Sequence, residues 1–138
     1  MQDFRQKIVI VVREDIPSWQ VMNTVAHVSG YLGNKIDTFL SDENFVTGDG
    51  QHHPRNSQYA IIILKNTEKG LRKLMRRVRE SGLLYHGFIR EMIETTDDSE
   101  IQKILGNKKD EEIEYLGIGI FGSIENIHEL TQGMSLWK

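Results

Sequence analysis

The pattern of apolar positions begins with an uninterrupted run, Ile8 to Val12, inside the segment 7–13. A run of this kind is typical of a strand buried on both faces, as in the middle of an α/β sheet. The segment 18–32 follows and predicts a helix, because its apolar residues recur at the spacing of one helical face. They are Val21, Val25, Val28 and Leu32. Gly33 and Asn34 are expected to end this helix.

Beyond the helix, the same patterns predict further elements. Residues 41–56 are rich in Asp, Asn, Gly, His and Ser and predict a polar loop. Strands are expected at 59–65, 84–94 and 114–121, and helices at 67–81, at 123–130 and, after a loop, within 96–106. Residues 107–112 predict an exposed, charged connection and 131–138 a tail. Strands alternating with helices predict an α/β fold in one domain, 1–138. We expect a three-layer α/β/α sandwich around a small, mostly parallel, four-stranded mixed sheet.

Composition narrows the classes of function. The chain has 138 residues, no cysteine and a formal net charge of −3. The lack of cysteine excludes disulfides, thiol catalysis and cysteine-bound zinc. The net charge disfavours a general nucleic-acid binder but allows a local basic face. No signal-like segment and no apolar run near ~20 residues is present, so we expect a cytoplasmic protein without a membrane partner.

Polar residues gather where the first strand ends and the first helix starts, which in open α/β sheets is where ligands bind. Arg13 and Asp15 follow the strand, and Asn23 and Thr24 lie early in the helix. These four side chains could bind a ligand, with His27 as the titratable member of the pocket. The polar stripe of the helix fits equally the solvent-exposed face that any surface helix shows opposite its core. Asp15 could instead cap the helix, since Pro17 suits a first helical turn.

Three segments of the chain, in order, resemble the type II peptidyl-tRNA hydrolase superfamily. The first is the strand and turn from Lys7 to Ile16 with the helix after it. The second is Ile89-Arg90-Glu91 with Thr95, similar to the family's Val-Arg-Asp-Ala-Gly-Arg-Thr. The third runs from Tyr115 to Leu136 and is similar to the last strand, last helix and closing Thr-Gly-x-Leu tail. The resemblance implies that family's fold and a homodimer. The turn Ile-Pro-Ser-Trp at 16–19 fits better a branch with no assigned function.

The first helix departs from the family at the catalytic positions. Hydrolases of this type carry a Gly-Lys pair near its start, where this chain has Val21 and Met22. A methionine cannot supply the charge or the donors that a lysine brings to an ester or phosphate. Ala26 and Ser29 stand in place of the family's Gln and His. The residues closest to a catalytic set are Gln20, His27, Glu91 and Thr95.

Glu91 and Thr95 have two readings. A carboxylate paired with a hydroxyl can orient a water or a substrate hydroxyl. The same residues also fit an edge strand with alternating charges followed by a turn.

Two further patterns suggest chemistry that we do not expect. Gly117-Ile-Gly119-Ile-Phe-Gly122 matches a dinucleotide-binding fingerprint, but too little chain follows for the required βαβ unit. We expect Gly117 and Gly119 to let a helix or a ligand approach the strand. His52 and His53 lack metal-ligand spacing. Neither a metal nor a cofactor is expected.

The helix predicted at 67–81 carries a local excess of positive charge. Its apolar residues form a core face, which leaves Arg72, Arg76 and Arg79 pointing outward on a single stripe. This stripe could bind the phosphates of tRNA or a small anion, or it could be only a solvated surface.

Three functions follow, in the order that the residues favour. The first is a protein without hydrolase activity that binds a small or nucleotide-like ligand beside Asp15, His27 and Glu91. The second is a divergent hydrolase of peptidyl-tRNA or a related ester. The third is an interaction protein whose pocket has no catalytic role. Leu136 and Trp137 near the carboxyl terminus are apolar and fit a dimer contact, although Trp137 could equally pack on its own fold.

Overall fold

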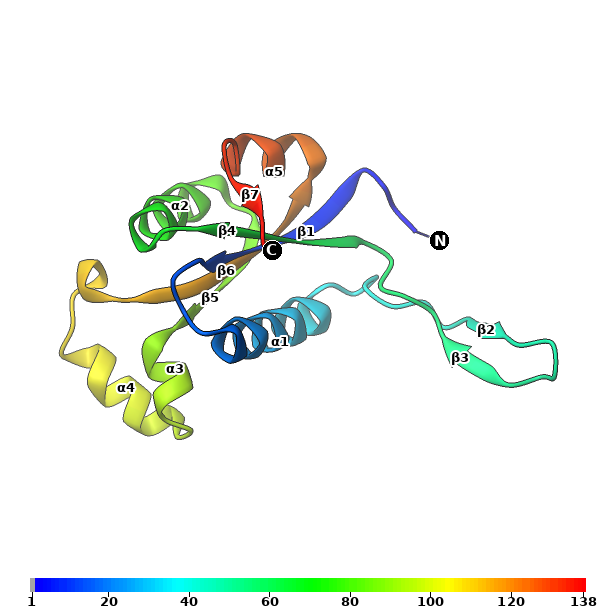
Figure 1. Cartoon of the computed structure of the whole chain (residues 1–138), viewed down its shortest axis with the longest axis horizontal. Coiled ribbons are helices and arrows are strands. Elements are labelled where there is room, and N and C mark those ends of the chain that lie inside the picture. The colour runs from blue at the N-terminus through cyan, green and yellow to red at the C-terminus, as the bar shows by residue number, and fades with distance from the viewer. Residues whose placement is uncertain (1) are drawn as a thin grey trace.

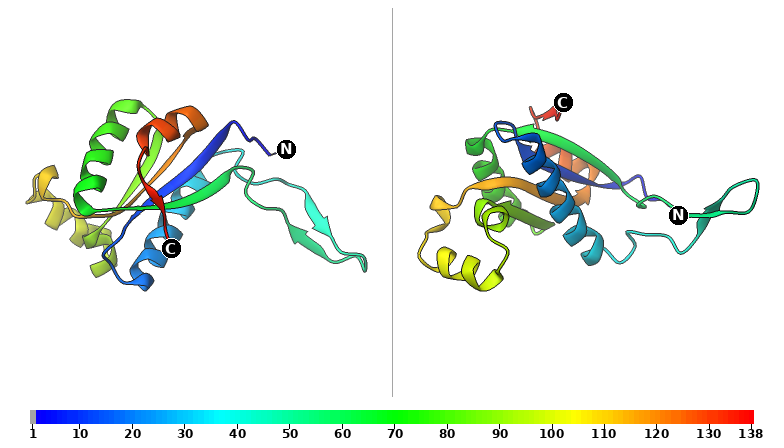
Figure 2. Two further views of the ribbon diagram at one scale, coloured as in Figure 1. Left: turned by 45° about the horizontal axis from the view of Figure 1, so that its top comes forward. Right: turned by 60° about the horizontal axis from the view of Figure 1, so that its bottom comes forward.

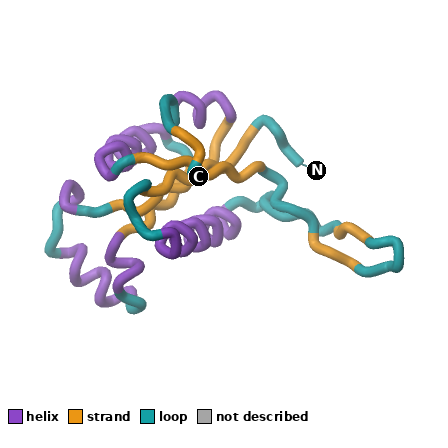
Figure 3. The backbone as a smooth tube through the Cα atoms, viewed as in Figure 1, coloured by secondary structure: helices purple, strands orange, loops and turns teal. Residues whose placement is uncertain are grey.

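A computed structural model describes residues 2–138 and shows a mixed α/β fold (Figure 1). The strands of its main sheet are β1 (Gln6–Arg13), β4 (Ala60–Asn66), β5 (Leu84–Ile89), β6 (Tyr115–Ser123) and β7 (Ser135–Leu136). The helices are α1 (Ser18–Lys35), α2 (Glu68–Ser81), α3 (Arg90–Glu94), α4 (Asp98–Gly106) and α5 (Ile124–Leu130), with a 3-10 turn at Asp110–Glu112. The sheet order is β5-β6-β1-β4-β7, and helices lie on both faces of the sheet (Figure 3).

The strand β1 lies at the centre of the sheet, as its apolar run predicts. Val9 and Val11 face a core shared with α2 and α5. Ile8, Ile10 and Val12 face the second core, which α1 covers. Alternate side chains of a strand point to opposite faces, so one apolar run holds both cores together.

The expected four-stranded, mostly parallel sheet is wrong in strand number and direction. Within residues 2–138 the sheet has five strands, and only the pair β1–β4 is parallel. The pairs β1–β6, β5–β6 and β4–β7 are antiparallel. Alternation of strands and helices does not determine the direction, because a connection as long as that between β5 and β6 can bring the chain back from either end of the sheet. The two-residue β7 is too short to leave a periodic pattern.

Two element boundaries also differ from the prediction. The strand expected over 84–94 ends at Ile89, and α3 follows. The apolar positions 88, 89, 92 and 93 repeat at i and i+4, which suits a helical turn better than a strand. The helix α1 continues past Gly33 and Asn34 to Lys35, because the amide of Ile36 donates to the carbonyl of Leu32 (2.9 Å) and the Ile36 side chain is buried.

Residues 41–56, expected to be a loop, form an arm around a small hairpin. The strands β2 (Asn44–Val46) and β3 (His52–Pro54) pair antiparallel, and the turn between them is closed by a hydrogen bond from Gly50 N to Thr47 O (3.0 Å). Figure 2 shows this arm projecting clear of the rest of the chain beyond the amino-terminal end of β4.

Gly117 and Gly119 of β6 bring α1 close to the sheet. A Cβ atom on Gly119 would lie 2.1 Å from Val28 Cγ1, and one on Gly117 would lie 2.5 Å from Thr24 Cγ2. Both positions therefore confirm that missing side chains allow a helix to approach. No helix within residues 2–138 is long and apolar enough to cross a bilayer.

Candidate functional site

A cavity of about 710 Å³ lies between α1, β5 and the segment that carries α3 and α4. Its lining residues come from two distant parts of the chain: Trp19, Asn23 and His27 from α1, His86 and Phe88 from β5, and Met92, Ile93, Thr95, Thr96, Asp98, Ile101, Gln102 and Leu105. A volume of this size falls within the range of small-molecule sites. Three of the predicted site residues, Asn23, His27 and Thr95, meet in this cavity.

The helix α1 supplies one wall. It begins at Ser18 with Pro17 as its N-cap residue, and no side chain caps it. Asp15 is therefore not the helix cap; its carboxylate instead accepts from Arg13. One turn of helix separates Trp19 from Asn23, and His27 lies a further turn along, so the three residues share a face. Trp19 is 57% exposed and lies where an entering ring could stack on it.

Two histidines take part in aromatic stacking between α1 and β5, one from each element. His27 stacks on Phe88 with ring centroids 4.9 Å apart, and His86 stacks on Tyr31 at 4.3 Å. Burial of His86 lowers its pKa, and the nearby His27 lowers it further. His86 is therefore neutral at pH 7 and can act as both a donor and an acceptor of hydrogen bonds.

The third wall is mostly apolar. Ile101 of α4 is buried and Leu105 partly so, and Met92 and Ile93 reach the cavity from α3. The Thr95 hydroxyl donates to Glu100 (2.8 Å) rather than to Glu91. The carboxylate–hydroxyl pair expected from Glu91 and Thr95 is thus not formed between their side chains.

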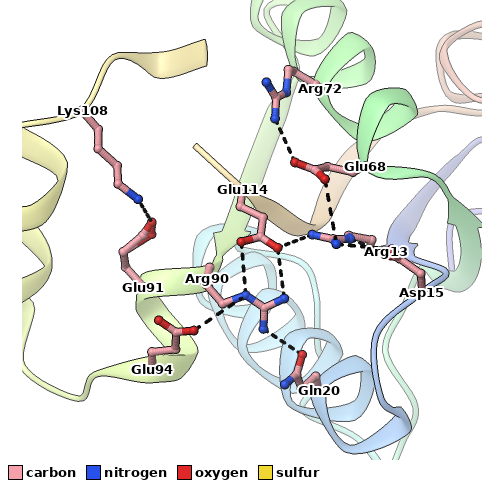
Figure 4. A network of polar contacts seen from close by, with 10 residues as sticks. All are labelled: Arg13, Asp15, Gln20, Glu68, Arg72, Arg90, Glu91, Glu94, Lys108 and Glu114. Atoms are coloured by element: carbon pink, nitrogen blue, oxygen red, sulfur yellow. Dashed lines mark hydrogen bonds and ion pairs between the residues drawn. The ribbon is translucent and has the colours of Figure 1, made fainter. Parts of the chain in front are cut away.

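Beside the cavity, at the end of β1, a network of ion pairs surrounds Glu114 (Figure 4). Arg13 donates to Asp15 (2.6 Å) and to Glu114, and its guanidinium lies 3.9 Å from Glu68. Hydrogen bonds from Arg90 and Arg13 lower the pKa of Glu114. The bond to Asp15 contributes most to raising the pKa of Arg13, and it lowers the pKa of Asp15.

Arg90 connects this network to α1. Its guanidinium donates to Glu114 (3.1 Å) and to the side-chain oxygen of Gln20 (2.9 Å). Gln20 is therefore held outside the cavity lining. The charges of Arg13 and Arg90 are already neutralised by carboxylates of this chain, so neither is free to bind an anion without breaking those pairs.

Glu91 is buried and does not line the cavity. Its side chain comes from α3, which the incorrect strand prediction had missed, and it accepts from Lys108 Nζ (3.3 Å). Its second oxygen, Oε2, is buried without a hydrogen-bond partner in the described residues. Most buried polar atoms in folded proteins have a partner, so this oxygen is an exception within the described residues.

Thr24 lies away from the cavity. It is fully buried against Gly117, and its hydroxyl donates to the carbonyl of Gln20 (2.8 Å). Thr24 therefore packs in the core between α1 and β6 and does not line this cavity.

The basic stripe on α2 is partly paired within the chain. Arg79 donates to Asp110 (2.6 Å) and to the Tyr115 hydroxyl (2.9 Å). Arg72 donates to Glu68 (2.9 Å) and to the carbonyl of Glu111 (2.6 Å). Arg76 is exposed and forms no ion pair within residues 2–138. Of the three predicted phosphate ligands, only Arg76 is thus free of such contacts.

Sequence reasoning missed the structural roles of several residues. Arg90, Lys108 and Glu114 hold the walls together, and Trp19 and Phe88 supply aromatic surface. Arg90 is adjacent to Glu91 in the segment that resembles the hydrolases, so its position in the sequence could have indicated a role. No sequence pattern pointed to Lys108, because its partner Glu91 is 17 residues away.

Chemically, the cavity offers rings for stacking, amide and hydroxyl groups for hydrogen bonds, and two imidazoles for proton transfer. Within residues 2–138 no group of three or more His, Asp or Glu side chains is arranged to hold a metal ion.

Comparison with known proteins gives a family and a fold. A family model described as "Protein of unknown function (DUF2000)" matches residues 6–138. A solved structure of a protein of unknown function from Agrobacterium tumefaciens strain C58 superposes with a TM-score of 0.87, at 20% identity, over 99% of this chain and 100% of that chain. At that identity the likeness concerns the fold alone. No curated protein matches the chain.

Proposed function

This chain belongs to the DUF2000 family, whose function is unknown, and from that premise we propose that it binds a small, nucleotide-like ligand in the cavity between α1, β5 and α4. The observation that carries this proposal is the meeting of Trp19, Asn23 and His27 with His86 and Thr95 around one volume of about 710 Å³. Such a combination of apolar walls and a few convergent polar groups is typical of ligand sites.

The character of the lining favours a flat ring as the part of the ligand that is recognised. Trp19 is exposed at the cavity, and Phe88 already stacks on His27. Asn23 and neutral His86 each offer a donor and an acceptor, the groups needed to read the edge of a heterocycle. The neutralised guanidiniums of Arg13 and Arg90 hold the cavity's surroundings in place and do not bind the ligand.

Trp19 provides the experiment. The chain has two tryptophans, so in a Trp137→Phe background the fluorescence reports Trp19 alone. We expect at least one of the four common ribonucleoside monophosphates to quench this fluorescence saturably. His27→Ala and Asn23→Ala should weaken binding roughly 10-fold or more, as loss of a contact worth about 1.4 kcal/mol does.

The matched control is His128→Ala on α5, an exposed histidine on the opposite face of the sheet. It should leave the affinity unchanged. Absence of quenching by all four nucleotides, or equal losses in His27→Ala and His128→Ala, would refute this function.

A divergent peptidyl-tRNA or ester hydrolase is the second candidate. Met22 is 63% exposed and brings no charge to the site, but Lys108 places an ammonium 3.3 Å from Glu91. That ammonium is paired with Glu91 and does not line the cavity, so the order of the three resembling segments is what supports this candidate. The test is release of tRNA from peptidyl-tRNA. On the first proposal the native chain acts no faster than buffer, and Met22→Lys raises any trace activity. Turnover that is lost in His27→Ala or in Glu91→Gln would place the hydrolase first.

Kinship with the type II peptidyl-tRNA hydrolases also remains part of the proposal, supported by the order of the three resembling segments. We likewise propose a cytoplasmic location, a homodimer and contact of α2 with tRNA. The third candidate, an interaction protein whose cavity is unused, would be favoured by failure of both the nucleotide and the hydrolysis tests.

A further inference from the structure

Basic side chains are missing from the lining of the cavity between α1, β5 and α4. Among the residues that the structure describes, those that line it include no lysine and no arginine. Apart from the two histidines, Asp98 is the only lining residue that can carry a charge. Asp98 is exposed, and its carboxylate forms no ion pair within residues 2–138. A ligand in the cavity therefore meets an unpaired carboxylate but no lysine or arginine.

The elements around the cavity explain this distribution of charge. From Ser18 to Asn34, α1 contains no Lys, Arg, Asp or Glu, and neither does β5. On α4 the lining residues follow the spacing of one helical face, and they are Asp98, Ile101, Gln102 and Leu105. The basic residue of this helix, Lys103, lies off that face. The lack of basic groups is thus a property of three elements and does not depend on one side chain.

Basic residues of neighbouring segments are held by other groups. Lys108 donates to the buried carboxylate of Glu91 (3.3 Å), and Arg90 donates to Glu114 (3.1 Å), as Figure 4 shows. The ammonium of Lys35, at the end of α1, lies over an aromatic ring at 5.7 Å from its centroid. These three cations do not line the cavity, so a phosphate group bound there would have no basic partner among them.

The amino-terminal end of α4 does not replace the missing cations. The exposed amides at such an end attract anions in many proteins. Here the side chain of Asp97 already accepts from the Ser99 amide (2.8 Å), and Asp98 and Glu100 lie in the first turn. Hydrogen bonds from Ser99 lower the pKa of Asp97, which is therefore ionised at pH 7. A phosphate that approached this end would meet three carboxylates of the chain itself.

We propose that the ligand of this cavity is a nitrogen heterocycle without a phosphate group, a nucleobase or a nucleoside, and that Asp98 selects against the phosphorylated form. This inference rests on the proposed function and narrows its class of ligand. The face of an aromatic ring carries partial negative charge, so Trp19 stacks on a neutral ring but does not attract a phosphate. Asn23 and His86 supply the donors and acceptors that the edge of a base requires.

Paired titrations test the proposal. The fluorescence of Trp19 in the Trp137→Phe background is followed at pH 8, where free imidazole is neutral, with the four common ribonucleosides and their 5′-monophosphates. For the base that binds best, the nucleoside should bind roughly 10-fold more tightly than its monophosphate at ~20 mM salt, because like charges repel. The difference should shrink at ~500 mM salt, which screens exposed charges over a few ångströms.

Variants of Asp98 assign the selection to its charge. Asp98→Asn keeps the size of the side chain and should bring the two affinities within about twofold of each other. Asp98→Lys should reverse the order, so that the monophosphate binds more tightly than the nucleoside. The matched control is Asp42→Lys in the arm, an exposed position outside the cavity that changes the net charge equally. It should keep the preference of the native chain.

The outcomes separate this inference from the proposed function. A monophosphate that binds as tightly as its nucleoside, or a preference that survives Asp98→Asn, would overturn the inference and leave the proposed function standing. Quenching by nucleosides alone would refute a nucleotide as the ligand and support the inference. No quenching by any nucleoside or monophosphate would refute both.

Discussion

Glu114 shows how one side chain links several elements. It lies between the 3-10 turn at Asp110–Glu112 and β6, and it accepts from Arg13 of β1 and Arg90 of α3. Arg90 in turn donates to Gln20 of α1. Arg13 and Arg90 are 101 and 24 positions from Glu114 along the chain. Such a group stabilises the folded state only while it is ionised.

The first prediction concerns acid sensitivity. Because the pKa of Glu114 is lowered in the folded state from its ordinary 4.5, its contribution to stability is complete above about pH 4.5 and falls as the pH drops through the lower folded value. We expect Glu114→Gln to reduce the free energy of unfolding at pH 7 and to flatten its decline below pH 4.5. Urea titrations of both proteins across this range measure the difference. Parallel curves would contradict the assignment.

The second prediction concerns Gly119. An alanine Cβ there would lie 2.1 Å from Val28 Cγ1, so Gly119→Ala should destabilise the fold by about 1–3 kcal/mol. Adding Val28→Ala should recover part of that loss, because the obstructing methyl group is removed. Gly30→Ala is the matched control. Its Cβ meets nothing within 4 Å and it lies inside α1, so it should stabilise by about 0.4–1 kcal/mol.

The third prediction concerns Lys108. Its removal in Lys108→Met leaves the buried carboxylate of Glu91 without its partner, which should cost about 1–3 kcal/mol. Because the Lys108 side chain is 35% exposed, water screens the pair and favours the lower end of that range. Glu91→Met added to Lys108→Met should restore stability. Thermal unfolding of the four proteins of this cycle gives the coupling energy, and a value near zero would contradict the pair.

At the scale of elements, α2 shows why a charge pattern alone misjudges a surface. Its core face was predicted correctly, and Leu71, Leu74, Met75 and Val78 are buried. Thr67 caps the helix by accepting from Gly70 N, and the helix ends at Gly82 in a left-handed conformation. The partners of its arginines were not predicted, because Asp110 and Glu111 reach α2 from a connection that sequence spacing does not bring near it.

The fourth prediction separates the arginines of α2. If the helix binds tRNA, Arg76→Gln should lower the slope of log affinity against log salt by about 0.7–0.9, the contribution of one phosphate contact. Arg79→Gln should in addition lower the melting temperature, because it breaks contacts with Asp110 and Tyr115. Undetectable tRNA binding at ~50 mM salt would mean that the helix is only a solvated surface.

Element type was predictable wherever one periodic pattern dominated. β1 and α1 have such patterns, and both form as expected. The segment from Phe88 to Ile93 repeats its apolar residues at i and i+4, and the strand changes to a helix where the pairing of β5 with β6 ends at Ile89. The hairpin in the arm has no apolar alternation, so only its turn residues signalled it.

At the scale of the molecule, the residues expected to form a pocket account for only part of the candidate cavity. The start of α1 adjoins the cavity, and Asn23, His27 and Thr95 line it. Arg13 and Gln20 instead belong to the network around Glu114. A single sequence shows which side chains lie near a strand end, but not which charges neutralise one another there.

The walls of the cavity differ in how extensively they pack on the rest of the chain, which affects how fast a ligand enters and leaves. α1 packs on β1, β5 and β6, whereas α4 packs mainly against the short α3. Opening free energy follows packing, so backbone amides of α1 should exchange with deuterium orders of magnitude more slowly than those of α4. A ligand would then enter by transient detachment of α4, and its residence time would depend on how often α4 detaches. Slower deuterium exchange of the α4 amides on binding would report that dependence.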